Sequence, residues 1–168
     1  MSLNKKFKNY YLETILILII FFLDRISKLF VIHQDKLNFN SEIYSSKFLN
    51  IHLIWNEGIA FGLFSFNENY LYNGLTFLIF LVIIFIIFMI RKSDPLRKYA
   101  LLLVLGGALG NFFDRIIYKA VPDFIDFHVG NFHWFIFNVS DIFITIGIFL
   151  MIIIEIVSKP ETTNNEKI

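Results

Sequence analysis

The sequence predicts an α-helical membrane protein with four transmembrane helices, both termini in the cytoplasm and a small β-containing segment outside the membrane. The chain has 168 residues, of which 57% are hydrophobic and 17% charged. A soluble domain of this length cannot bury so much apolar surface. The apolar residues also gather into four segments near the roughly 20 residues that cross a hydrocarbon core of about 30 Å. A net charge of +1 and the lack of Cys argue against nucleic-acid binding and exclude thiol chemistry.

The four predicted spans are residues 10–32, 71–90, 99–118 and 137–157. The second contains no charged residue, whereas the other three each carry carboxylates. Lys5, Lys6 and Lys8 before the first span resemble the start of a signal peptide, but no small-residue cleavage site follows. The first segment is therefore expected to be a retained helix.

Basic residues in the short loops set the predicted orientation, because they concentrate on the cytoplasmic side. Nine lie on one side of the predicted spans, namely Lys5, Lys6, Lys8, Arg91, Lys92, Arg97, Lys98, Lys159 and Lys167. Three lie on the other, namely Lys36, Lys47 and Lys119. Both termini are thus expected in the cytoplasm, and the loops 33–70 and 119–136 outside.

The chain is expected to form one membrane domain over residues 1–158, followed by a polar tail at 159–168. The first outer loop is too long to lack structure. Within it, Ile51, Leu53 and Trp55 recur at every second position, which favours a strand. An amphipathic sheet at the outer membrane surface would account for this pattern.

Carboxylates from distant parts of the chain fall into one layer near the outer surface. Asp24 lies about 12 Å below the outer end of its helix, and Asp114 and Asp141 lie near the outer ends of theirs. Asp123 and Asp126 lie in the loop that joins the last two spans. Ionisable groups inside membranes are functional candidates by default. Structural pairing, of Asp24 with Lys28 and of Asp114 with a neighbouring arginine, is the alternative.

Two neighbouring carboxyls permit aspartic peptidase chemistry, because one retains its proton while the other acts as a base. Paired aspartates also serve proton-coupled transport, so a small transporter is the alternative function. A scaffold would need no clustered carboxylates. His128 and His133 with Asp123 and Asp126 offer metal ligands, although their spacing matches no usual zinc motif. Ser140 has no histidine in its own segment. Gly106, Gly107 and Gly110 are expected to allow close helix packing.

Ordered motifs along nearly the whole chain resemble the signal peptidase II family, the bacterial lipoprotein signal peptidases. They are Leu23-Asp-Arg-Ile-Ser-Lys28, Asn56-Glu-Gly-Ile-Ala-Phe-Gly62, Gly106-Gly-Ala-Leu-Gly-Asn-Phe-Phe-Asp-Arg115, Val121-Pro-Asp-Phe-Ile-Asp-Phe127 and Phe137-Asn-Val-Ser-Asp141. Arg25, Ser27, Ile59 and Ser140 depart mildly from the family's common residues.

The resemblance implies a metal-free aspartic endopeptidase without cofactors in the bacterial cytoplasmic membrane. It implies cleavage of diacylglyceryl-modified prolipoproteins just before the lipidated cysteine, at the outer face, with membrane lipids as further partners. A monomer is expected. The motif match implies a catalytic pair of Asp123 and Asp141. It also implies supporting or substrate-binding roles for Asp24, Lys28, Asn56, Gly58, Asn111, Asp114, Arg115 and Asn138.

The local backbone conformation decides whether Asp123 and Asp126 face the same side of the chain. A helical turn would place both on one face, whereas an extended chain would send them to opposite faces. Pro122 fixes its own φ and biases Val121 towards an extended conformation. The extended conformation is therefore predicted, so that only one of the two meets Asp141. The resemblance points to Asp123.

Overall fold

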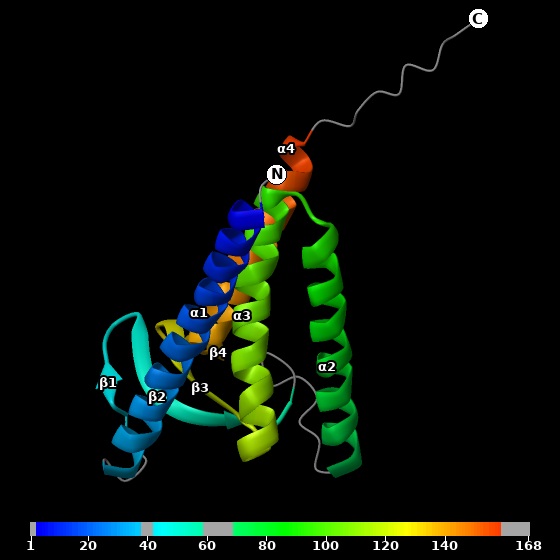
Figure 1. Cartoon of the computed structure of the whole chain (residues 1–168). Helices are drawn as coiled ribbons and strands as arrows, with labels where there is room; N and C mark the ends of the chain where they lie inside the picture. The colour runs from blue at the N-terminus through cyan, green and yellow to red at the C-terminus, as the bar shows by residue number, and fades with distance from the viewer. Residues whose placement is uncertain (1–2, 38–41, 59–68, 159–168) are drawn as a thin grey trace, which may run out of the picture.

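Four long helices and one antiparallel sheet make up the molecule (Figure 1). The computed structural model describes residues 3–37, 42–58 and 69–158. The helices are α1 (Leu3–Leu37), α2 (Asn69–Lys92), α3 (Pro95–Tyr118) and α4 (Val139–Val157). The strands are β1 (Tyr44–Ser45), β2 (Leu49–Asn56), β3 (Val121–Val129) and β4 (Phe132–Phe137). The predicted tail at 159–168 lies outside the described residues, as do parts of the first outer loop.

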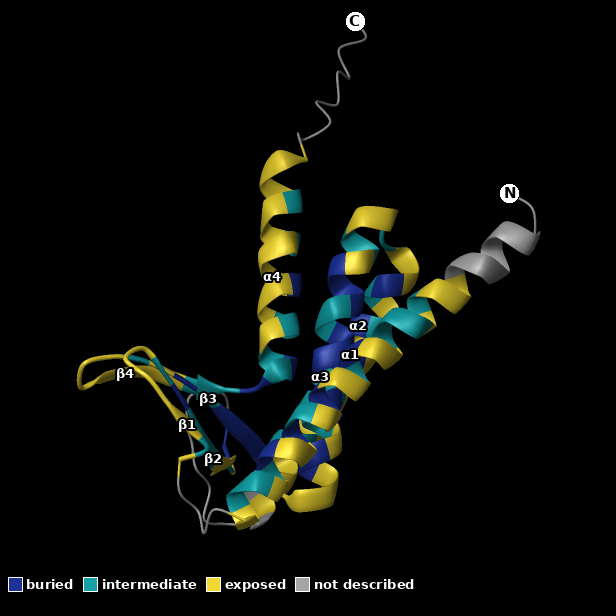
Figure 2. Ribbon diagram, turned by 90° about the vertical axis from the view of Figure 1, so that its left-hand side faces the viewer, coloured by how far each residue is buried: buried dark blue, intermediate teal, exposed yellow. Residues whose placement is uncertain are grey.

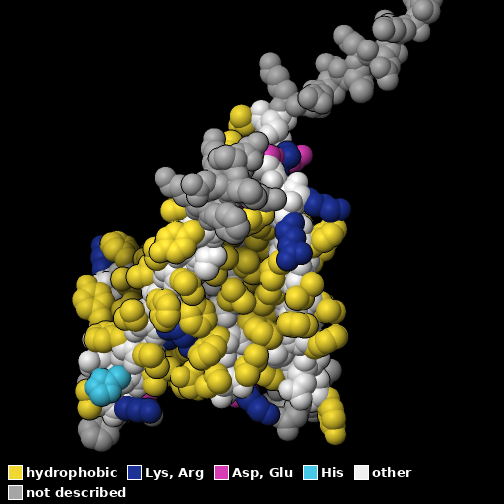
Figure 3. Space-filling view, viewed as in Figure 1, with side chains coloured by type: hydrophobic (Ala, Val, Ile, Leu, Met, Phe, Trp, Pro, Cys, Tyr) yellow, Lys and Arg dark blue, Asp and Glu magenta, His cyan; other side chains and the backbone are white. Residues whose placement is uncertain are grey.

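Three helices within the described residues are long and apolar enough to cross a membrane. They comprise Tyr72–Lys92, Pro95–Tyr118 and Val139–Val157. Apolar side chains cover the face of the bundle shown in Figure 3, as expected for helices surrounded by lipid. Helix α1 is longer than its predicted span and carries Asp24, Arg25 and Lys28 within its apolar part. Its crossing of the membrane stays a prediction.

Helix α3 is the centre of the bundle and packs against each of the other three helices. A core of Ile83, Ile86 and Ile90 from α2 meets Leu102 and Leu105 of α3. The opposite face of α3 approaches α4 closely, because a Cβ at Gly107 or Gly110 would collide with Ser140. The prediction that these glycines serve close helix packing is confirmed.

The four strands form one antiparallel sheet in the order β1-β2-β3-β4. The strand predicted around residues 50–55 is confirmed as β2. The β-containing segment predicted between the first two spans is therefore present, and β3 and β4, which lie between α3 and α4, add two strands that were not predicted. The extended conformation predicted for Asp123 and Asp126 is confirmed by β3.

The sheet lies beside the beginning of α4, at one end of the bundle (Figure 2). Helix α1 begins, and helix α4 ends, at the opposite end (Figure 1). Helix α4 begins at Val139 rather than at 137, because Phe137 belongs to β4 and Asn138 caps the helix. The single residue between β4 and α4, Asn138, thus places the first turn of α4 at the end of β4.

Candidate active site

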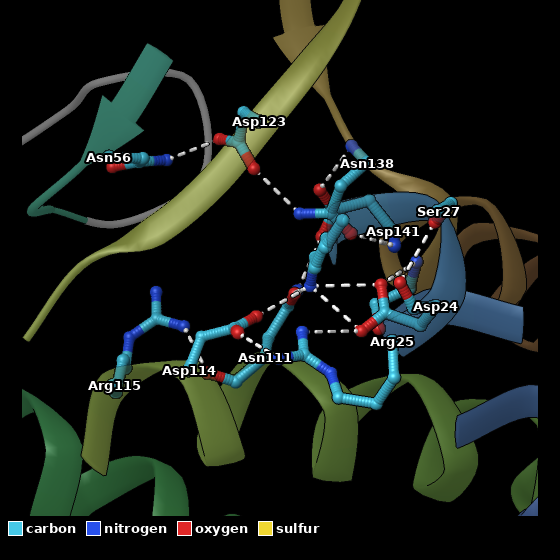
Figure 4. Close-up of polar contacts among 12 residues, drawn as sticks. Asp24, Arg25, Ser27, Asn56, Asn111, Asp114, Arg115, Asp123, Asn138 and Asp141 are labelled. Atoms are coloured by element: carbon cyan, nitrogen blue, oxygen red, sulfur yellow. Dashed lines mark hydrogen bonds and ion pairs between the residues drawn. The ribbon is translucent and has the colours of Figure 1, made fainter. Parts of the chain in front are cut away.

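Asp123 lies on β3 between two asparagine side chains, as Figure 4 shows. Asn56 Nδ2 donates to Asp123 Oδ2 at 2.9 Å, and Asn138 Nδ2 donates to Asp123 Oδ1 at 2.6 Å. Burial, together with the negative charge of Asp141, raises the pKa of Asp123 from its ordinary value of 3.8 to about 6. The two amide hydrogen bonds oppose this rise only in part. Asp123 is therefore a carboxyl group that titrates close to neutral pH.

Asp141 occupies the first turn of α4, where the helix cap fixes its side chain. Asn138 Oδ1 accepts from the backbone N–H of Asp141 at 3.1 Å, and the backbone N–H of Asn138 donates to Asp141 Oδ2 at 3.1 Å. This reciprocal pair is a capping box. Asn111 Nδ2 donates to Asp141 Oδ1 at 2.7 Å. One residue, Asn138, thus contacts both Asp123 and Asp141.

Asp123 and Asp141 line the same cavity, which has a volume of about 770 Å³. Its other walls come from β3, β4, the first half of α4 and Phe48, which precedes β2, and they are almost wholly apolar. The apolar walls include Phe48, Phe127, Trp134, Phe137, Ile142 and Ile146. The cavity therefore combines two carboxyls with a surface suited to an apolar ligand.

A second polar group lies beneath this pair, between α1 and α3, and consists of Asp24, Arg25, Lys28 and Asp114. Lys28 Nζ contacts Asp24 at 2.9 Å and Asp114 at 2.7 Å. Arg25 contacts Asp24 at 3.0 Å and Asp114 at 2.6 Å. All four side chains are buried. Two cations and two anions thus neutralise each other, as buried charges require.

This charged layer is connected to the cavity by two hydrogen bonds. Lys28 Nζ donates to Asn111 Oδ1 at 2.8 Å, and the same amide donates to Asp141. Asp24 Oδ1 accepts from the backbone N–H of Ser140 at 3.0 Å. The layer therefore holds both a partner of Asp141 and the first turn of α4.

Arg115 and Gly58 hold Asn56 in position on the side away from Asp123. Arg115 donates to the carbonyl oxygens of Asn111 at 3.2 Å and Gly58 at 3.1 Å. The backbone N–H of Gly58 donates to Asn56 Oδ1 at 2.9 Å, which turns the amide N–H₂ of Asn56 towards Asp123.

Every residue that the sequence assigned to the site takes part in these contacts. The pairing of Asp24 with Lys28 is confirmed. The expected pairing of Asp114 with a neighbouring arginine was wrong, because Arg115 donates to backbone carbonyls instead. Asp114 pairs with Arg25, which the sequence analysis did not place in the site. Arg25 directly follows Asp24 in the sequence, and this position could have indicated its role. A second buried cation is needed to balance the charges of Asp24 and Asp114.

The structure gives different outcomes for the two alternative chemistries, a serine nucleophile and a metal site. Ser140 Oγ has no hydrogen-bond partner within the described part of the chain, so nothing there acts as its base. Asp126, His128 and His133 do gather into one group, whereas Asp123 is not part of it. Three of the four possible metal ligands considered from the sequence therefore come together, without Asp123.

The bundle and its cavity define a helical membrane protein with a buried carboxyl, Asp123, and a half-buried one, Asp141, beside an apolar chamber. Residues 16–157 match the family model described as signal peptidase (SPase) II. The chain belongs to the signal peptidase II family.

Curated relatives and solved structures agree with this membership. The lipoprotein signal peptidase of Pelagibacter ubique (strain HTCC1062) is 50% identical over 159 residues, covering 95% of this chain and 96% of that protein. The lipoprotein signal peptidase of Anaplasma phagocytophilum (strain HZ) is 36% identical over 137 residues, covering 80% and 85%. A solved bacterial membrane enzyme structure matches with a TM-score of 0.67 at 26% identity, covering 88% of this chain and 94% of that one.

Proposed function

We propose that this protein is an aspartic endopeptidase that removes signal peptides from diacylglyceryl-modified prolipoproteins, cutting just before the lipidated cysteine. Family membership supports signal-peptide removal from lipoproteins in a bacterial membrane. The aspartic catalytic type is supported by one observation. Asp123 and Asp141 line the same cavity, and Asn138 forms hydrogen bonds with both. The alternative of a proton-coupled transporter finds no support in the family.

In the proposed reaction the two carboxyls share one proton. The ionised carboxylate takes a proton from a water molecule, whose oxygen attacks the scissile carbonyl carbon. The protonated carboxyl donates to the carbonyl oxygen, and the tetrahedral intermediate collapses with proton transfer to the leaving amine. Asn56, Asn111 and Asn138 hold the pair through neutral amides, so the pair keeps a titratable proton near neutral pH.

We further propose that α1 is the fourth span, that both termini are cytoplasmic and that the sheet lies at the outer surface. The basic residues at the α2–α3 turn lie at the end opposite the sheet, in agreement with the positive-inside rule. Phe132 and Trp134 on β4 are exposed, as expected for side chains at a membrane surface. Reporter fusions at Ser45 and His128 should report an outside location, and one at Asp94 an inside location.

The substrate is proposed to enter with its acyl chains in the bilayer and its signal helix against the bundle. The apolar walls of the cavity suit a lipidated segment better than a polar peptide. Because one chain contributes both aspartates and the asparagines that hold them among the described residues, we propose that the monomer is the active form.

The test is cleavage of a synthetic prolipoprotein peptide by the purified protein in lipid nanodiscs. The peptide with a diacylglyceryl cysteine should be cut before that cysteine, and the same peptide with an unmodified cysteine should not. Cleavage should persist with EDTA and without an ion gradient. Equal cleavage of both peptides, or loss with EDTA and recovery with zinc, would contradict the proposal.

A further inference from the structure

A second group of ionisable side chains lies on the β3–β4 hairpin, apart from the Asp123–Asp141 pair. Asp126 and His128 belong to β3, and His133 belongs to β4 directly across from His128. One ligand atom from each of the three side chains lies within 4.8 Å of the other two. We propose that Asp126, His128 and His133 form a binding site for a divalent transition metal ion, with zinc as its best match.

The hairpin itself brings the three residues together. The turn at Gly130, whose φ is +60°, joins strands whose register places His128 opposite His133. Their rings stack at a centroid distance of 5.1 Å with an interplanar angle of 22°. Asp126 Oδ2 lies 2.8 Å from His133 Nδ1. All three ligands therefore belong to one short, locally folded unit.

Unpartnered buried atoms distinguish this group from an ordinary Asp–His hydrogen bond. The side chain of Asp126 is only 1% exposed, yet its Oδ1 has no hydrogen-bond partner among the described residues. The buried Nδ1 of His128 also has none within the same ranges. Buried polar atoms without partners are costly and rare. The Asp126–His133 contact accounts for neither atom, whereas a bound cation would satisfy the carboxylate and accept imidazole ligands.

The ligand types select the metal. Two imidazoles and one carboxylate suit zinc and its first-row neighbours, whereas magnesium and calcium prefer oxygen ligands alone. Zinc bonds of about 2.0–2.1 Å to nitrogen place tetrahedral ligand atoms roughly 3.3 Å apart. The 2.8 Å contact is already close to this spacing. The side chain of His133 is 51% exposed, so its ring has room to turn towards the ion and the fourth position is open to water.

A metal ion here would connect the two strands of the hairpin. Phe127 and Trp134, neighbours of the ligands in β3 and β4, line the cavity. The ion would therefore stabilise the hairpin that carries this wall, and because it supplies no catalytic group, cleavage should persist when EDTA removes it. Because the proposed metal site contains neither Asp123 nor Asp141, the metal-binding proposal can be tested independently of the proposed peptidase activity.

The test is zinc titration of the full-length protein in nanodiscs, purified without a polyhistidine tag and treated with chelator beforehand. Isothermal titration calorimetry should show one zinc ion bound per chain, and the melting temperature should rise with zinc concentration. His133→Ala and Asp126→Asn should each weaken binding at least tenfold. His33→Ala, which removes a histidine on α1 outside the group, should leave binding unchanged.

A rescue variant separates ligation from a structural role. His133→Cys supplies a thiolate, which is also a zinc ligand, so it should restore binding that His133→Ala loses. With Co²⁺ in place of zinc, it should add a thiolate-to-metal charge-transfer band that the wild type lacks. Zinc binding weaker than about 1 mM, equal binding by the His128→Ala/His133→Ala double variant, or loss of binding in His33→Ala would overturn the proposal.

Discussion

The molecule holds two pairs of aspartates, Asp24 with Asp114 and Asp123 with Asp141, and the partners of the two pairs differ in kind. Asp24 and Asp114 each contact both Arg25 and Lys28. Asp123 and Asp141 are held by asparagine amides and backbone N–H groups, and neither has an ion pair with any described residue. The charge of a carboxylate between two cations is balanced by ion pairs. A carboxylate held by amides keeps its ability to exchange a proton. The first group is therefore suited to structure and the second to proton transfer.

Replacing the amide-held carboxylates should have the largest effect on activity. Asp123→Asn and Asp141→Asn should each lower the cleavage rate by about 10³-fold or more, because an amide can be neither base nor shared-proton partner. Protein yield should remain near normal, since each amide keeps nearly the same volume. The measurement is initial cleavage rate on the lipidated peptide at matched protein levels.

Asp126→Asn is the matched control, because Asp126 lies on the same strand but bonds to His133. It should retain measurable turnover. If Asp126→Asn is inactive while Asp123→Asn cleaves, the catalytic pair has been assigned to the wrong aspartate.

Substitutions in the ion-paired group should lower the stability of the protein more than its catalytic activity. Lys28→Met removes one cation and leaves two buried carboxylates with one cation between them. Removing one partner of a buried ion pair costs about 3–5 kcal/mol, so yield and melting temperature should fall sharply. Activity per folded molecule should fall less than in Asp141→Asn.

A double variant sharpens this test. Arg25→Met with Asp114→Asn removes one charge of each sign and should be more stable than either single variant. If Lys28→Met instead leaves stability unchanged and abolishes turnover, the charged layer takes part in catalysis and the comparison fails.

The two groups also differ in how far the sequence could predict them. The Asp24–Lys28 pair follows from helical spacing alone. The contact of Arg25 with Asp114 does not, because it depends on how α1 packs against α3. Similarly, the resemblance implied only supporting or substrate-binding roles for the three asparagines Asn56, Asn111 and Asn138. Which amide meets which carboxylate depends on the pairing of Asn56 with Val121 in the sheet.

Two local signals in the sequence were present but not used. Gly130-Asn131 between apolar segments is typical of a two-residue hairpin turn, and it would have predicted β3 and β4. Asn138 and Asp141 stand three residues apart before an apolar segment, which is typical of a capped helix start. Pro122 did predict the extended backbone around Asp123, because its effect on conformation is local.

Arg115 should show an intermediate effect, because it contacts backbone carbonyls rather than either group of carboxylates. Arg115→Ala removes the donor to Gly58 and loosens the support of Asn56. Both yield and activity should fall, with activity reduced about tenfold, consistent with the loss of a supporting interaction. Arg115→Lys, which retains one donor group, should recover part of both. A variant with normal yield and no turnover would show that Arg115 acts directly in catalysis.

The smallest effect should be on the pH dependence of stability. The pKa of Asp123 is raised from 3.8 to about 6 in the folded protein, so the folded state binds this proton more tightly than the unfolded state does. The resulting stabilisation is fully present below pH 3.8 and is lost as pH rises to about 6. The melting temperature of the wild type should fall over this interval, and Asp123→Asn should lack this contribution. A control variant in the ion-paired group, Asp24→Asn, should keep it.

The same proton should limit catalysis. If the pair must hold one proton, kcat/KM should decline as pH rises through the upper apparent pKa of the pair and as pH falls through the lower one. Because kcat/KM reports the free enzyme, the decline towards alkaline pH should begin near pH 6, where Asp123 titrates. The measurement is kcat/KM on the lipidated peptide in nanodiscs of neutral lipid, so that surface charge does not shift local pH. Asn56→Ala removes an amide donor to the Asp123 carboxylate, which disfavours its charged form, and should move the alkaline limb upward. A profile that is flat from about pH 5 to about pH 9, or a limb that Asn56→Ala moves downward, would show that the amide-held carboxylates do not share the catalytic proton.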